Sequence, residues 1–146
     1  MSSHLGKFVP DMRLTHPCSL LIAGATGTGK SFFIKNMIEC DGIKGGLDTI
    51  YYFMPRLEDV NIKPLEHQSL ILMEGLPTKH WVDDTFKIGE NTQSNCLIVI
   101  DDQWSACIEN PVIEYLLTYG RRHLNLSLFF VAQNFYEKSR KAITLR

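Results

Sequence analysis

The sequence has no long hydrophobic run, and this absence argues against a membrane-spanning helix. Its uninterrupted apolar segments, such as Leu20–Ala23 and Cys96–Ile100, are far shorter than the ~18 residues that cross a bilayer. The N-terminal segment MSSHLGKFVP contains no apolar stretch of the kind found in signal peptides. We therefore expect a soluble, intracellular protein without a membrane partner.

Cysteine is also sparse, and its spacing excludes the common zinc sites. Cys18, Cys40, Cys96 and Cys107 form no C-x-x-C pair and have no histidine pair beside them. Cys18 and Cys96 adjoin apolar runs, where a free cysteine behaves as a small hydrophobic residue. We expect reduced thiols, as in intracellular proteins.

Neither sign of charge is in excess, since 15 Lys and Arg against 16 Asp and Glu give a net charge of −1. The whole molecule therefore makes no electrostatic case for binding nucleic acid. Its 146 residues are 45% apolar and 21% charged, a composition that indicates one folded domain. Disordered tails, collagen-like fibres and coiled coils are excluded.

What the sequence does have is an alternation of short apolar runs with amphipathic segments. The runs predict strands over residues 19–24, 49–53, 69–73, 96–100 and 127–132, and the segments predict helices over 30–41, 78–88 and 111–120. We expect the strand over 19–24 to be buried on both faces and Gly120 to end its helix. Residues 1–17 form a lead-in segment, 55–68 are irregular, and Ala142–Leu145 begins a further strand. The alternation predicts an α/β fold, a three-layer α/β/α sandwich with a mostly parallel sheet, as one domain over residues 18–146.

The segment after the first strand reads GATGTGKS and matches the phosphate-binding pattern G-x-x-x-x-G-K-[ST] in full. Its residues are Gly24, Ala25, Thr26, Gly27, Thr28, Gly29, Lys30 and Ser31. The glycines let backbone N–H groups wrap a phosphate chain. Lys30 places an ammonium on the β- and γ-phosphates, and Ser31 offers a hydroxyl to Mg²⁺. The segment therefore predicts a site for ATP and Mg²⁺.

Polar residues follow two further apolar runs. Asp101 ends the run LIVID, where a buried carboxylate needs a partner such as Mg²⁺. Asp102 comes next and either positions the attacking water or merely caps the following turn. Gln133 follows SLFFVA, where its amide either hydrogen-bonds the γ-phosphate and the water or is an ordinary residue at a strand end.

An arginine pair lies between the last predicted helix and the last of these strands, in the segment Gly120-Arg121-Arg122-His123. Arginine supplied to a neighbouring subunit's nucleotide stabilises charge in the transition state of phosphoryl transfer. We favour Arg122 over Arg121 for this function. The alternative is a pair of exposed arginines that the dipole of the helix stabilises.

The order of these motifs, SLLIAGATGTGKS, SLILMEGLP, CLIVIDDQ and GRRHLNLSLFFVAQNFY, resembles the genome-packaging ATPases of the FtsK/HerA superfamily. Such ATPases occur in poxviruses, other large DNA viruses, virophages and Polinton-like elements. The resemblance implies a RecA-like P-loop NTPase core of the additional-strand type. It also implies a homo-oligomeric ring, often a hexamer, in which ATP hydrolysis drives double-stranded DNA into a capsid.

The resemblance further implies a capsid protein as a partner, and a place in the host cell or the virion. Carried over by position, Lys30 and Ser31 belong to the phosphate loop, Asp101 and Asp102 to the acidic pair, Arg122 to the finger and Gln133 to the sensor. Members of the family continue beyond the sensor, whereas this sequence ends at Arg146. We therefore expect a C-terminally short core, either a minimal or truncated ATPase or a fragment.

Two other functions are compatible with the residues. A small P-loop kinase would use the same glycine-rich loop, although it needs an acceptor site and usually an arginine-rich lid. A nucleotide-binding module or remnant without turnover is favoured by Asp102, which is one methylene shorter than the glutamate usual at that position. The sequence favours the ATPase over both.

Overall fold

The computed structural model describes residues 11–25, 27–87 and 94–133, and its centre is one five-stranded parallel sheet. The strands are β2 (Ser19–Ala23), β4 (Thr49–Met54), β5 (Ser69–Glu74), β6 (Cys96–Asp101) and β7 (Leu126–Ala132). Their order across the sheet is β2-β7-β6-β4-β5. The α/β class and the parallel sheet are thereby confirmed, while the expected strand at Ala142–Leu145 lies outside the described residues.

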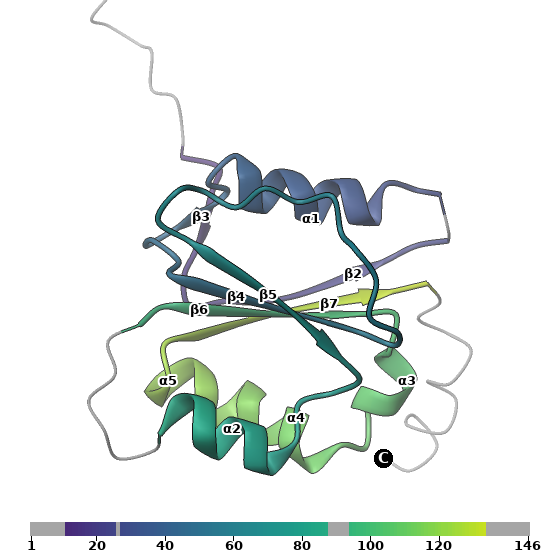
Figure 1. Cartoon of the computed structure of the whole chain (residues 1–146), viewed down its shortest axis with the longest axis vertical. Coiled ribbons are helices and arrows are strands. Elements are labelled where there is room, and N and C mark those ends of the chain that lie inside the picture. Colours follow the sequence, from purple (N-terminus) through teal and green to yellow (C-terminus); the bar gives the residue numbers. More distant parts are fainter. Residues whose placement is uncertain (1–10, 26, 88–93, 134–146) are drawn as a thin grey trace, which may run out of the picture.

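Helices cover both faces of this sheet (Figure 1). They are α1 (Lys30–Glu39), α2 (Lys79–Phe86), α3 (Trp104–Cys107), α4 (Pro111–Tyr115), the π-helical η2 (Leu116–Gly120) and α5 (Arg121–His123). The helix α1 lies on one face, and the later helices lie on the other. This arrangement is compatible with the predicted three layers. Two short strands, β1 (Leu14–Thr15) and β3 (Ile43–Lys44), pair in parallel as a separate small sheet.

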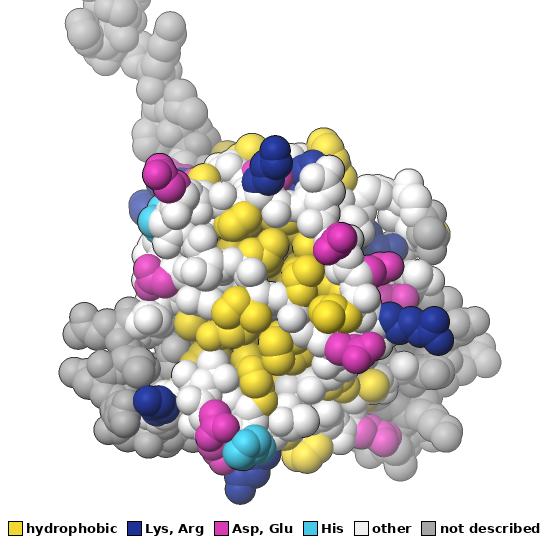
Figure 2. Space-filling view, in the orientation of Figure 1, with side chains coloured by type: hydrophobic (Ala, Val, Ile, Leu, Met, Phe, Trp, Pro, Cys, Tyr) yellow, Lys and Arg dark blue, Asp and Glu magenta, His cyan; other side chains and the backbone are white. Residues whose placement is uncertain are grey.

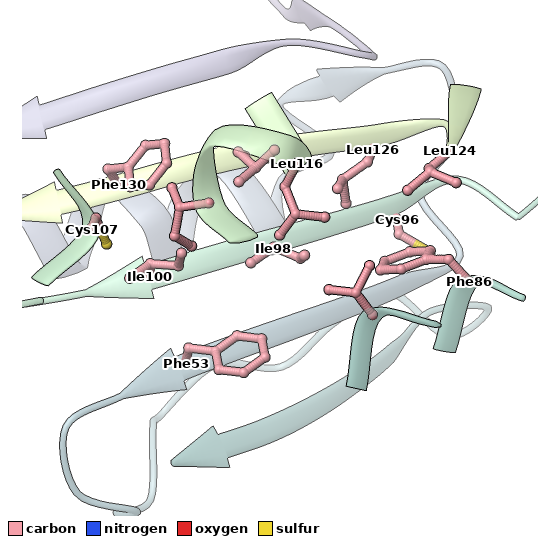
Figure 3. Packing of buried hydrophobic residues seen from close by; sticks show 13 residues of the cluster. Phe53, Phe86, Cys96, Ile98, Ile100, Cys107, Leu116, Leu124, Leu126 and Phe130 are labelled. Atoms are coloured by element: carbon pink, nitrogen blue, oxygen red, sulfur yellow. The ribbon is translucent and has the colours of Figure 1, made fainter. Parts of the chain in front are cut away.

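The central strands build a core on each face because successive side chains of a strand point to opposite sides. On β6, Ile98 and Ile100 pack among residues of α2, α4 and η2 (Figure 3). The intervening Leu97 and Val99 pack on the other face, in the cluster that contains Ile34 and Ile38 of α1. Near-continuous apolar runs are therefore required in β6 and β7, which are covered on both faces.

The prediction that Ser19–Gly24 forms a strand buried on both faces is wrong. In β2 the side chains alternate between exposed and half-buried, and Leu21 keeps 37% of its surface exposed. The reason is its place in the sheet, since among the described residues β2 pairs only with β7. β5 occupies the opposite edge, where Figure 2 shows hydrophobic side chains gathered on the surface, and Ile71 of β5 is 40% exposed.

The prediction that Gly120 ends its helix is also wrong. The helix begins as expected at Pro111, behind an Asn110 side chain that accepts hydrogen bonds from two backbone N–H groups. It continues through Gly120, which has helical dihedrals, into α5. A Cβ at Gly120 would lie 2.9 Å from Cδ2 of the fully buried Leu126. Glycine is therefore needed here for close packing against β7.

Candidate functional site

A pocket of about 700 Å³ lies where the carboxyl ends of the strands meet. It is lined by Lys30 after β2, Glu58 after β4, Asp101 at the end of β6 and Gln133 after β7. These residues are far apart in the sequence, and the parallel sheet brings them to one edge because all its strands end there. Gly27, Gly29, Ser31 and Asp102 also line the pocket, so the structure groups the predicted loop, acidic pair and glutamine.

The glycine-rich loop, residues 24–31, turns tightly between β2 and α1. Gly27 and Gly29 have φ angles of 84° and 94°, in the left-handed region that other residues rarely adopt. The Thr28 hydroxyl donates a hydrogen bond to the Ala25 carbonyl at 2.7 Å, which closes the turn. Thr26, also predicted to belong to the site, lies outside the described residues. The local sequence thus accounts for the shape of the loop.

The loop leads directly into the N-terminus of α1, which begins at Lys30. Within the described part of the chain, no side chain caps this N-terminus and no acidic residue lies in the first turn. Its backbone N–H groups are therefore available to an anion, which the helix dipole also favours. The Lys30 ammonium donates to the backbone carbonyls of Gly24 and Ala25, so a positive charge lies beside the same loop.

Asp101 is held in place by a tyrosine from the neighbouring strand. The hydroxyl of Tyr52, on β4, donates to Oδ2 of Asp101 at 2.9 Å. Burial raises the pKa of Asp101, while the hydrogen bond from Tyr52 and the nearby charge of Lys30 act in the opposite direction. Burial, and then the carboxylate of Asp101, raises the pKa of the Tyr52 hydroxyl. The tyrosine therefore stays protonated and orients the carboxylate.

Asp102 and Gln133, which also line the pocket, come close to each other. The Gln133 amide nitrogen and Oδ2 of Asp102 are 3.5 Å apart. Asp102 has a φ of 55°, which aspartate tolerates better than most residues. Its backbone N–H donates to the Val131 carbonyl at 2.9 Å, which fixes the turn to β7. The sequence placed these two residues in one site, and the structure brings their side chains together.

Ser31 and Asp101 have the oxygen donors that Mg²⁺ prefers, a hydroxyl and a carboxylate, and they line one pocket. Tyr52 engages only one of the two Asp101 oxygens. No group of three or more His, Cys, Asp or Glu side chains in the described ranges could hold a metal by itself. The residues therefore fit a metal that completes its shell with water and with oxygens of a bound phosphate, as Mg²⁺ commonly does.

The contribution of β4 and of the segment after it was not predicted from the sequence. Tyr52 contacts Asp101, and Arg56 and Glu58 line the pocket together with Met54. Phe32, 66% exposed on the first turn of α1, lines it too. A usable signal was present in Pro55–Glu58, because polar residues after a parallel strand lie at the ligand-binding edge. The polar residues after the runs over 96–100 and 127–132 were predicted to belong to the site, whereas those after the run over 49–53 were not.

The structure does not bring Arg122 to the pocket of its own chain. Arg121 and Arg122 are exposed and belong to α5, which precedes β7 at the end of the sheet opposite the pocket (Figure 1). The seven residues of β7 separate the two ends by about 23 Å at ~3.3 Å per residue. An action of Arg122 at such a pocket would therefore require a second copy of the chain.

Comparison of this chain with protein-family models, with curated proteins and with solved structures gives no match. In the part of the chain that the structure describes, no helix combines the length and apolar character needed to cross a membrane.

Proposed function

We propose that this chain is an Mg²⁺-dependent ATPase with a RecA-like core of the additional-strand type. In this proposal it is a subunit of a motor that moves double-stranded DNA into a viral capsid. The observation that supports ATPase activity is that Lys30, Asp101 and Gln133, which lie at the ends of three strands, line one pocket. The strand order supports it, because β7 lies between β2, which leads into the glycine-rich loop, and β6, which ends in the acids.

Each group has a distinct function in this proposal. Lys30 and the N–H groups of the loop bind the phosphates, and Ser31 and Asp101 hold Mg²⁺. The bound metal supplies positive charge to the phosphate oxygens. Gln133 and Asp102, whose side chains meet, orient a water molecule for in-line attack on the γ-phosphate. The chain thus offers preorganised groups for phosphoryl transfer to water.

The DNA, ring and capsid parts of the proposal are supported by the resemblance in motif order. The position of the arginine pair is compatible with a ring, because Arg122 lies at the end of the sheet away from its own pocket. A second copy would be needed to place it against the nucleotide, as in phosphoryl-transfer enzymes that receive an arginine in trans.

A nucleotide-binding module without turnover is the second candidate. Asp102 supports this candidate, because it stands where the longer glutamate is usual and its Oδ2 already lies beside the Gln133 amide. The short side chain reaches less far towards a water molecule. A kinase has less support, since the described residues show one arginine in the pocket, Arg56, rather than an arginine cluster.

The proposal is tested by ATP binding and phosphate release, with and without double-stranded DNA, for the wild type and Lys30→Ala. Loss of the ammonium removes a charged contact to the phosphates. We expect about 10- to 100-fold weaker ATP binding and loss of hydrolysis. Lys35→Ala is the matched control, because Lys35 lies on α1 but does not line the pocket.

The products separate the candidate functions. Release of inorganic phosphate supports the ATPase, and stimulation by DNA supports the motor. Phosphate transfer to an added hydroxyl compound would indicate a kinase. ATP binding that requires Lys30, without hydrolysis at any protein concentration, would establish the binding module.

A further inference from the structure

The segment that follows β4 contributes an acidic residue to the lining of the pocket. β4 ends at Met54, and Pro55, Arg56 and Glu58 then line the pocket. The backbone N–H of Glu58 lies 3.1 Å from Sδ of Met54, to which it donates, and Met54 is 3% exposed. The backbone at Glu58 is therefore in contact with the core through Met54.

Glu58 lies close enough to Asp101 and Tyr52 to act on them electrostatically. Its charge is one of the causes that raise the pKa of Asp101 and of the Tyr52 hydroxyl. Glu58 follows β4, Asp102 follows β6 and Gln133 follows β7, and all three line the pocket together with Asp101.

The three acidic residues that line the pocket differ in the partners of their carboxylates. Asp101 accepts the hydrogen bond of Tyr52, and Oδ2 of Asp102 lies beside the Gln133 amide. In the described ranges, no hydrogen bond or ion pair holds the carboxylate of Glu58, which is exposed at the pocket. Its side chain is also one methylene longer than that of either aspartate. Glu58 is therefore the carboxylate best placed to accept a proton from a water molecule.

We propose that Glu58, rather than Asp102, is the general base of the hydrolysis, an inference that rests on the proposed ATPase function. The water oxygen forms a bond to the γ-phosphorus, and the bond from that phosphorus to the β–γ bridging oxygen breaks. The bonding electron pair leaves with ADP. One proton of the water passes to the Glu58 carboxylate and from there to solvent. Asp102 and Gln133 then position the water without taking its proton.

The test compares Glu58→Gln with Asp59→Asn and Asp102→Asn in steady-state hydrolysis and in equilibrium binding of a fluorescent ATP analogue. Glutamine keeps the size of Glu58 but cannot accept the proton. We expect Glu58→Gln to lower kcat at least about 100-fold, the usual contribution of a general base, with Kd within about threefold of the wild type. Asp59 is the matched control, since it is the next residue, is exposed and does not line the pocket. Asp59→Asn should keep kcat within about twofold of the wild type.

Each other outcome overturns the inference in a recognisable way. If Glu58→Gln hydrolyses ATP like Asp59→Asn while Asp102→Asn is inactive, the ATPase stands and Asp102 is its base. If Glu58→Gln weakens binding and leaves kcat unchanged, Glu58 only contacts the nucleotide. If the wild type binds ATP but does not hydrolyse it, with or without DNA, the proposed function itself fails. An unchanged thermal unfolding midpoint of Glu58→Gln establishes that the exposed substitution leaves the fold intact.

Discussion

At the scale of single residues, the contact between Tyr52 and Asp101 shows how a core residue shapes the site. Tyr52 is 3% exposed, and its ring packs in the cluster beneath α1. Its hydroxyl donates to Asp101, which lines the pocket. A hydrogen bond to a carboxylate both orients it and favours its charged form. Groups of this kind, which orient a metal ligand, commonly change metal affinity when they are removed.

We expect Tyr52→Phe to raise the Mg²⁺ concentration for half-maximal hydrolysis about tenfold. The ring stays in the core, and only the bond that orients Asp101 is lost. Binding of ATP in the absence of Mg²⁺ should not change. A titration of hydrolysis and of nucleotide binding with Mg²⁺ measures both effects.

Tyr51→Phe is the control, because the Tyr51 ring lies on the other face of β4, against Trp81. An equal effect of the two substitutions would mean that Tyr52 acts through general stability and not through Asp101.

At the scale of elements, one serine joins the segment before β2 to the start of β7. Ser127 is the buried polar residue among those described, with 0% exposure. Its Oγ accepts the backbone N–H of Cys18 at 2.9 Å and lies 2.7 Å from Nδ1 of His16. Burial is the main cause that lowers the pKa of His16, so the neutral ring is favoured in the folded protein. The strand β2, which leads into the glycine-rich loop, is therefore held to β7 by this polar contact as well as by its backbone pairing.

We expect Ser127→Ala to lower the free energy of unfolding by about 1–3 kcal/mol, because it leaves the Cys18 N–H without its acceptor in the interior. Urea denaturation at pH 8 measures the change. His16 is neutral there in the folded and the unfolded chain, since its ordinary pKa of 6.5 is only lowered by folding.

Ser105→Ala serves as the comparison, because Ser105 is exposed on α3. A loss of stability below about 0.5 kcal/mol for Ser127→Ala, the range of surface substitutions, would show that the contact contributes little.

At the scale of the whole molecule, the pocket and the Arg121–Arg122 pair occupy opposite ends of the sheet (Figure 1). A single chain therefore presents its nucleotide-binding groups at one end and this arginine pair at the other. Arg56 lines the pocket of its own chain and is the alternative source of a guanidinium. The two arrangements predict different behaviour when copies of the chain are mixed.

We expect Lys30→Ala and Arg122→Ala each to abolish hydrolysis. In an equimolar mixture of the two variants, about one site in four should recover activity, because each site in a ring is shared between two neighbouring copies. In such a site the Arg122→Ala subunit supplies Lys30 and its neighbour supplies Arg122. Hydrolysis measured against mixing ratio and total protein concentration reports the recovery.

Arg121→Ala should retain activity as the neighbouring control. The alternative is that Arg56 of the same chain supplies the guanidinium to the nucleotide. In that case Arg122→Ala alone would be fully active, and its rate of hydrolysis would be strictly first order in protein concentration.

Much of the fold follows from local patterns in the sequence. The runs of β6 and β7 predict buried strands because nearly every residue is apolar, and α1 begins where the loop predicts it. The glycine-rich loop is equally local, since Gly27 and Gly29 supply the left-handed dihedrals that its turn requires. Asp101 and Gln133 could be selected because each directly follows such a run, and Asp102 because it comes next to Asp101.

What the sequence alone determined is therefore the five strands of the central sheet, the helices that begin with α1, α2 and α4, and the residues at the strand ends, because propensity and periodicity act over a few neighbouring positions. The short elements β1, β3 and α3 were not predicted. Only the tertiary structure decided that β2 lies at an edge, that Gly120 packs against Leu126, and that Glu58 shares a pocket with Lys30. These facts depend on which strands pair across the sheet. Pairing is set by contacts between residues distant in the chain, which no local pattern records.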